Sequence, residues 1–124
     1  MARILITSRP TRQYLDPVRY LTNASSGRMG CALVESAIEA GHEVVVVSGP
    51  VEVEYPAAAT VLPVVSTEEM LAVAQREFLM CDGLIGVAAP CDYRPVLVSE
   101  QQIAKTGAPL ILHREEPPDV CATL

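Results

Sequence analysis

The chain has 124 residues, a length that fits one domain, and its 50% hydrophobic and 19% charged content is typical of a globular protein with its own core. Its net charge of -6 excludes a general nucleic-acid or anionic-membrane binder, because phosphate surfaces are bound by broad basic patches. No apolar run approaches the roughly 20 residues that cross a bilayer, and no secretion signal is recognisable, so we expect a cytoplasmic protein without membrane contact.

The cysteines are widely spaced, without a C-x-x-C pair, and only two histidines accompany them. The sequence therefore predicts no metal site and no disulfide framework. Cys91 stands near a loop tip, where a thiol can act as a nucleophile. No histidine lies in the local motif to activate it, which favours a packing role.

The apolar run over residues 3–8 is typical of a strand buried on both faces of a parallel sheet. Pro10 and Pro17 exclude a helix or a central strand in the segment that follows, which we predict to be a loop of about 18 residues. Loops of this length in compact domains usually carry function.

A helix is predicted over residues 27–40, followed by Gly41, which suits a helix end, and by a second buried strand over residues 43–48. Together with the first strand they form a right-handed crossover unit with parallel strands. The expected apolar face of this helix repeats at intervals of three and four: Met29, Ala32, Leu33, Ser36 and Ala37.

A shorter strand is predicted over residues 60–65, and Pro63 places it at an edge of the sheet. Ser66 and Glu69 match a helix capping box, so a second helix is expected over residues 67–80. Its expected apolar face consists of Met70, Leu71, Val73, Ala74, Phe78 and Leu79.

The remaining residues predict a buried strand over 84–89, a polar tip over 90–95, a short helix over 99–105 and a further strand over 110–113. Alternating strands and helices indicate an α/β fold. We expect a Rossmann-like, doubly wound, mainly parallel sheet of about five strands in a single domain over residues 1–124.

Positive charge is concentrated near the first helix. Residues 1–30 carry five arginines and one aspartate, or +4, which leaves four basic and fourteen acidic groups, or -10, for residues 31–124. Small residues at a helix start expose N–H donors at the positive end of the helix dipole, and arginine adds forked donors. Ser25, Ser26 and Gly27 therefore predict a phosphate or carboxylate site, with a solvated loop as the alternative.

Ligands of such sheets bind beyond the carboxyl ends of the strands. The loops after Ser8, Ser48 and Ala89 are thus expected to converge, with Asp92 facing the anion site. A nicotinamide enzyme is disfavoured, because neither a G-x-G-x-x-G turn after the first strand nor an acid at the end of the second is present. A Walker A loop is also missing.

Several motifs then match the order and spacing of one family: Thr7-Ser8, Thr11-Arg12, Asp16 to Asn23, Ser25 to Gly30, Val47 to Pro50 and Asp92 to Pro95. Through them nearly the whole chain resembles phosphopantothenoylcysteine synthetase. This family is the phosphopantothenate–cysteine ligase, the C-terminal domain of the bacterial DNA/pantothenate metabolism flavoprotein. The family domain continues further, so we expect the C-terminal part to be lacking here.

The resemblance implies a ligase of coenzyme A biosynthesis. It implies activation of the carboxylate of phosphopantothenate, a small anionic substrate, by CTP or ATP with Mg²⁺ as an acyl nucleotidylate, which the cysteine amine then attacks. It further implies a homodimer and a flavin decarboxylase partner, with no tightly bound flavin in this domain.

By the same resemblance, Asn23 is expected to contact the acyl intermediate, and Lys105 to replace a missing family lysine in catalysis. The implied substrate- and phosphate-binding residues are Ser8, Thr11, Arg19, Ser25, Ser26, Gly27 and Arg28. The implied nucleotide-binding residues are Ala88, Ala89 and Asp92. The residues alone leave plainer roles open, since Arg19 can simply pair with Asp16, and Asp92 can cap a turn.

Three departures from the family pattern concern positive charge and donors. Arg9-Pro10 replaces a usual Gly-Gly, Gln102 replaces a lysine, and Glu116 replaces another lysine. Two hypotheses follow: an active ligase, or a catalytically impaired or repurposed paralogue that binds a nucleotide or another phosphorylated metabolite.

Overall fold

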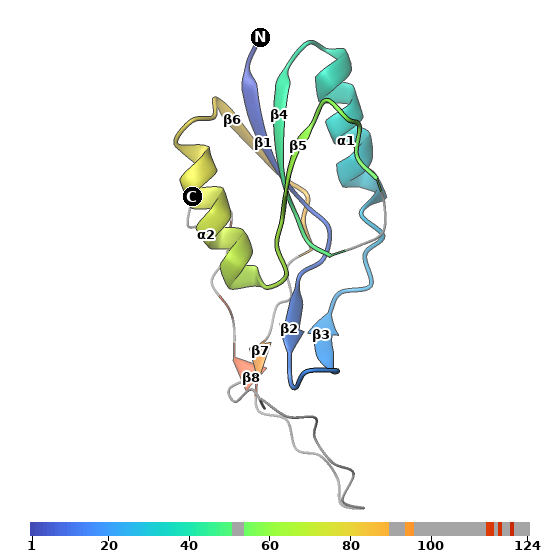
Figure 1. The fold of residues 1–124 in the computed structure, drawn as a ribbon, viewed down its shortest axis with the longest axis vertical. Coiled ribbons are helices and arrows are strands. Elements are labelled where there is room, and N and C mark those ends of the chain that lie inside the picture. The colour runs from blue at the N-terminus through green and yellow to red at the C-terminus, as the bar shows by residue number, and fades with distance from the viewer. Residues whose placement is uncertain (51–53, 90–93, 96–113, 116, 118–119, 121–124) are drawn as a thin grey trace, which may run out of the picture.

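A parallel sheet forms the centre of the computed structural model, which describes residues 1–50, 54–89, 94–95, 114–115, 117 and 120 (Figure 1). Its four strands lie in the order β5-β4-β1-β6. Their bounds are β1 Arg3–Ser8, β4 Glu43–Ser48, β5 Thr60–Pro63 and β6 Gly83–Gly86. The predicted Rossmann-like α/β fold with a mainly parallel sheet is confirmed, and so is the edge position of the strand that contains Pro63.

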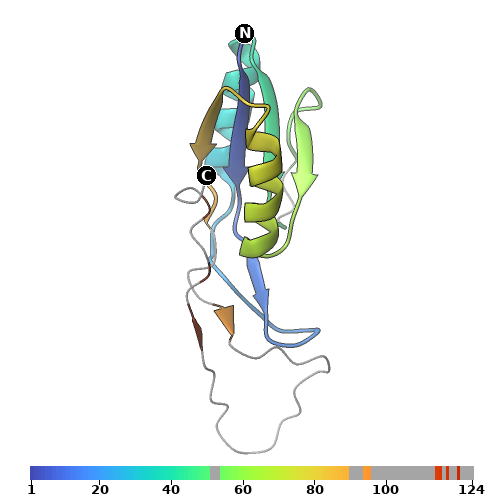
Figure 2. The same cartoon turned by 90° about the vertical axis from the view of Figure 1, so that its left-hand side faces the viewer.

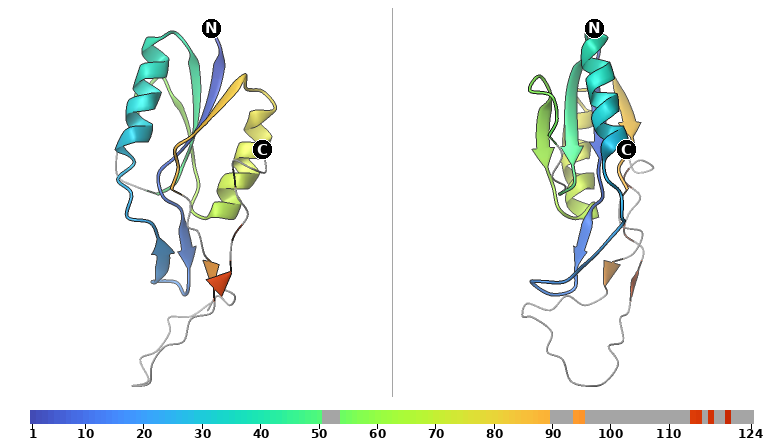
Figure 3. Two further views of the ribbon diagram at one scale, coloured as in Figure 1. Left: turned by 180° about the vertical axis from the view of Figure 1, so that it is seen from behind. Right: turned by 90° about the vertical axis from the view of Figure 1, so that its right-hand side faces the viewer.

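One helix covers each face of the sheet, α1 (Arg28–Glu39) and α2 (Thr67–Phe78) (Figure 2). In the right-hand view of Figure 3, α1 lies in front of the strands and α2 behind them. Because side chains alternate along a strand, Ile6 packs on the α1 side with Val34, whereas Leu5 packs on the α2 side with Met70 and Ala74. The central strands are apolar on both faces for this reason.

Helix α2 begins as predicted, because the Ser66 hydroxyl accepts a hydrogen bond from the Glu69 N–H at 3.1 Å. For α1 the expected apolar face was partly right: Leu33 and Ala37 pack against the core, whereas Met29, Ala32 and Ser36 are exposed. Met29 is 71% exposed, and the buried residues of this helix are Gly30 and Val34. Gly30, rather than Met29, faces β1, because the strand lies too close to the helix for a larger side chain.

That close approach is measurable at Gly30. A Cβ atom on this residue would lie 1.9 Å from Ser8 Oγ and 2.8 Å from Ser8 Cβ. Ser8 is itself completely buried at the end of β1. The first turn of α1 therefore rests directly on the carboxyl end of the central strand.

The predicted long loop after β1 is in fact an antiparallel hairpin of β2 (Arg12–Tyr14) and β3 (Tyr20–Thr22). It extends beyond the carboxyl end of β1 (Figure 1). The buried Asp16 carboxylate closes its turn by accepting hydrogen bonds from the Val18 and Arg19 N–H groups and from Arg19 Nη1, the last at 2.6 Å. This local hydrogen bonding replaces the irregular loop expected from the prolines.

Two short strands were not predicted, β7 (Arg94–Pro95) and β8 (Arg114–Glu115), which pair antiparallel with each other. The predicted helix over 99–105 and strand over 110–113 lie outside the described residues. None of the helices in the described part of the chain combines the length and apolarity that a membrane span requires.

The contact at Gly30 predicts a stability difference between two glycine substitutions. Gly30→Ala should lower the free energy of unfolding by about 1–3 kcal/mol, because the new methyl group overlaps Ser8. Gly83→Ala is the matched control, since a Cβ there meets nothing within 4 Å. Urea unfolding of both variants measures the difference, and equal stabilities would contradict the close packing.

The Asp16 turn predicts a second effect. Asp16→Asn should destabilise the fold by about 1.5–3 kcal/mol, because hydrogen bonds to a buried charged group are lost. Glu43→Gln serves as control; it removes a half-exposed carboxylate 3.9 Å from Arg3, and its effect should stay below about 1 kcal/mol. An Asp16 variant as stable as this control would show that the turn does not depend on the carboxylate.

Candidate functional site

The loops that follow β1, β4 and β6 meet at the carboxyl edge of the sheet, as predicted. The Gly49 N–H donates to the Ser8 carbonyl at 3.0 Å, and the Ala89 N–H donates to the Arg9 carbonyl at 3.2 Å. Pro10 and Ala89 also form an isolated parallel bridge. Since β1 is the middle strand of the three, its end holds both neighbouring loops.

The start of α1, where the sequence predicts an anion site, lies at this edge. Gly27 is its N-cap, with a positive φ of 74°, and among the described residues no side chain caps it. No acidic residue occupies the first turn. The Arg28 N–H donates a long hydrogen bond, 3.4 Å, to Ser26 Oγ. The helix end therefore keeps its positive potential.

Asn23 and the end of the predicted strand over residues 84–89 come together here. The Asn23 side-chain amide donates to the Ala89 carbonyl at 3.3 Å, and the neighbouring Ala88 packs on the apolar core. The predicted catalytic amide is thus held against the predicted nucleotide-binding segment. Asp92 and Lys105 lie outside the described residues.

Three of the other predicted substrate-binding residues make structural contacts. Ser8 is buried beside Gly30, the Thr11 hydroxyl lies 2.8 Å from that of Thr67, and Arg19 pairs with Asp16. Two of these contacts anchor the hairpin: one ties it to α2, and the other closes its turn. A role for these three residues in substrate binding stays a prediction.

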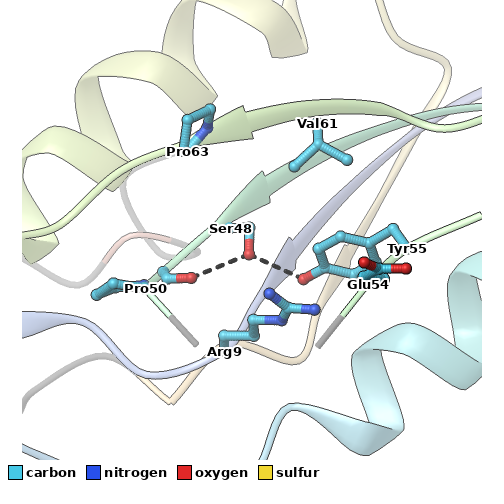
Figure 4. Close-up of a pocket in the computed structure, with 8 residues that line it drawn as sticks. Arg9, Ser48, Pro50, Glu54, Tyr55, Val61 and Pro63 are labelled. Carbon is cyan, nitrogen blue, oxygen red and sulfur yellow. Dashed lines mark hydrogen bonds between the residues drawn. The ribbon is translucent and has the colours of Figure 1, made fainter. Parts of the chain in front are cut away.

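The sequence did not predict that Arg9 is buried at this edge and stacks on Tyr55. Its φ of 72° is the only positive value among the described non-glycine residues, and the residue as a whole is only 5% exposed. The chain passes Gly27 so closely that a Cβ there would lie 2.5 Å from Arg9 Cγ. The guanidinium then stacks on the Tyr55 ring, 4.0 Å from its centroid (Figure 4). No local pattern in the sequence signals this pairing of residues far apart in the chain.

Arg9 and Tyr55 form part of a pocket of about 410 Å³ beyond β4 and β5. The Ser48 hydroxyl donates to the Gly49 carbonyl at 3.0 Å and lies 2.9 Å from the Tyr55 hydroxyl. The residues that line the pocket are Arg9, Ser48, Gly49, Pro50, Glu54, Tyr55, Val61 and Pro63. It combines one buried cation, one carboxylate and apolar walls.

The Cys81 thiol lies away from this edge of the sheet. Burial raises the pKa of the Cys81 thiol, an effect that the nearby Arg3 partly offsets, so Cys81 is a protonated thiol at neutral pH. It contacts the core below Arg3 at the amino end of β1, away from the loops described above. In the described ranges no three His, Cys, Asp or Glu side chains gather as metal ligands.

Comparison with known proteins shows the family to which this chain belongs. The model of the DNA/pantothenate metabolism flavoprotein C-terminal domain matches residues 1–124. The coenzyme A biosynthesis bifunctional protein CoaBC of Vibrio cholerae is 42% identical over 124 residues, which cover 98% of this chain and 31% of that protein. The Escherichia coli protein of the same name is 38% identical over 122 residues, covering 96% and 30%.

The chain thus spans about a third of the length of these relatives. A crystal structure of the C-terminal domain of a coenzyme A biosynthesis bifunctional protein CoaBC superposes with a TM-score of 0.84 at 39% identity, covering 98% of this chain and 56% of that one. The chain belongs to the DNA/pantothenate metabolism flavoprotein C-terminal domain family, the phosphopantothenoylcysteine synthetase family of coenzyme A biosynthesis.

Proposed function

We propose that the chain takes part in the phosphopantothenate–cysteine ligase reaction, with CTP or ATP and Mg²⁺ activating the carboxylate as an acyl nucleotidylate. The observation that carries the proposal is the meeting of Asn23 with Ala89 beside an α1 start that has no acidic residue in its first turn. Such an arrangement supplies one amide donor and one positive helix end on the same side of the sheet. Both are needed to bring an anionic nucleotide and an anionic acid together.

The proposed roles follow from these positions. Asn23 polarises the acyl group, and Ala89, with Asp92, contacts the nucleotide. The helix start at Ser25, Ser26, Gly27 and Arg28 binds the anionic group, and Lys105 contributes to activation. The exposed Arg28 adds positive charge at N1 of α1.

Assembly is part of the same proposal. A homodimer is proposed from the family pattern. A flavin decarboxylase partner is supported by the naming of the relatives as bifunctional and by the fraction of their length that this chain spans.

A repurposed binding module is a second candidate, and Arg9 favours it. The family pattern has glycine at this position, which lets backbone approach phosphate, whereas here a buried arginine side chain passes directly over Gly27. Such a module binds a nucleotide or another phosphorylated metabolite at the same edge without turnover.

The two candidates are separated by titrating the folded chain with CTP, ATP, CMP and phosphopantothenate, and by assaying pyrophosphate release. A ligase releases pyrophosphate only when phosphopantothenate is present. Asn23→Ala should then lower the release rate by roughly 10²–10³-fold, the usual effect of removing one donor to a developing oxyanion, with little change in CTP binding.

Ser36→Ala is the matched control, because Ser36 is exposed on α1 and should retain the full rate. Nucleotide binding without pyrophosphate release would favour the binding module. Absence of binding for every one of these compounds by a folded chain would exclude both.

A further inference from the structure

We propose that Thr22 is a positioning residue, which holds the Asn23 side-chain amide at the carboxyl edge of the sheet. Thr22 is the last residue of β3, and Asn23 follows it at the start of residues 23–27, which form neither helix nor strand. The end of the strand therefore sets where the backbone of Asn23 begins. That this placement serves catalysis rests on the ligase function proposed above, whereas the placement itself does not.

The Thr22 hydroxyl ties this strand end to the first strand of the hairpin. It donates a hydrogen bond of 2.8 Å to the Thr11 carbonyl and makes a longer contact, 3.4 Å, with the Asn23 carbonyl. Thr22 also pairs with Arg12 in the β2–β3 ladder. Because both partners of the hydroxyl are main-chain carbonyl groups, the side chain of Thr22 acts directly on the backbone that carries Asn23.

The Thr11 carbonyl is itself held in place from the other side. It belongs to the same peptide group as the Arg12 N–H, which donates to the Val65 carbonyl at 2.7 Å, just before α2. Because a peptide group is planar, fixing its N–H also fixes the direction of its carbonyl. The hydrogen bond from Thr22 therefore ends on a group that is attached to the body of the domain.

Two side-chain contacts strengthen this support at the start of α2. The hydroxyls of Thr11 and Thr67, two completely buried residues, lie 2.8 Å apart, and Gln13 Nε2 donates to Glu68 Oε2 at 2.9 Å. Figure 2 shows β2 next to this end of α2. A hydrogen bond shielded from water is stronger than one in open solvent. The hairpin is thus anchored by the helix on the face of the sheet opposite α1.

At its other end the support reaches the predicted reaction site. The Asn23 amide donates to the Ala89 carbonyl at 3.3 Å, which is long for an N–H···O hydrogen bond. Such a long bond constrains the amide only weakly, so the backbone placement supplied by Thr22 contributes to where the amide points. Precision matters here, because a misplacement of about 1 Å can slow a positioned reaction by about 10²-fold.

An NMR signal of the Asn23 side chain tests the placement without turnover. Asn23 is the only asparagine of the chain, so labelling asparagine with ¹⁵N at its side-chain amide gives a single pair of signals. Thr22→Val keeps the β-branched shape but removes the hydroxyl, and it should move this pair toward the shifts of a solvated amide. Thr22→Ser keeps the hydroxyl and should leave the pair in place. Thr60→Val, at the exposed start of β5, is the matched control and should also leave it in place.

Steady-state kinetics test the catalytic consequence. Thr22→Val should lower kcat for pyrophosphate release by roughly 10-fold and leave the KM for CTP unchanged, because the amide is displaced but still present. The same change made in the Asn23→Ala chain should have no further effect, since that chain has no amide to displace. Thr22→Ser and Thr60→Val should retain the kcat of the parent chain.

The proposal is overturned if Thr22→Val leaves the Asn23 signal where it lies in the parent chain, if Thr22→Ser moves it as far as Thr22→Val does, or if Thr22→Val leaves the kcat of an active chain unchanged. It is equally overturned if Thr22→Val lowers kcat by the same factor with and without Asn23, because the loss then reflects a general change in the fold. A parent chain that releases no pyrophosphate counts against the ligase function alone, and the Asn23 signal then decides the placement by itself.

Discussion

The end of β1 is the contact on which the rest of the functional edge depends. Ser8 lies completely buried there, and the start of α1 rests on it through Gly30, where even one added carbon would overlap the serine. The same strand end holds the loops after β4 and β6 through the carbonyls of Ser8 and Arg9. The helix dipole, the Asn23 amide and the pocket beyond β4 are consequently fixed with respect to one another before any ligand arrives.

The arginines near the N-terminus divide into two groups according to what they contact. Arg12 stacks on Tyr20 at 4.4 Å and Arg19 pairs with Asp16, so both stabilise the β2–β3 hairpin. Arg9 and Arg28 instead lie next to the start of α1. The concentration of positive charge seen in the sequence is therefore partly structural, and the anion site relies on fewer side chains than the charge count indicates.

Arg9 combines an unusual backbone conformation with a buried charged side chain. A non-glycine residue with a φ of 72° carries a conformational cost of order 1 kcal/mol, which its burial against Gly27 and Tyr55 offsets. The Arg9 side chain fills space at the start of α1, and the residue also lines the neighbouring pocket. The Arg9 side chain thus occupies space beside the helix start that a glycine would leave open to a phosphate.

The sequence by itself determined the features that depend on local periodicity and on short-range hydrogen bonds. The apolar runs over residues 3–8 and 43–48 predicted the two central strands, and Ser66 with Glu69 predicted the start of α2, because each pattern has its cause within a few residues. The motif around Asn23 and Ser25 likewise indicated the family, and Asn23 lies at the sheet edge where the site is proposed.

The tertiary structure alone decided the contacts between residues far apart in the chain. Arg9 meets Tyr55 because β1 and β4 are neighbours in register, and Met29 points outward because β1 admits only Gly30 beneath the helix. Such pairings follow from packing in three dimensions, which no local pattern of side chains encodes.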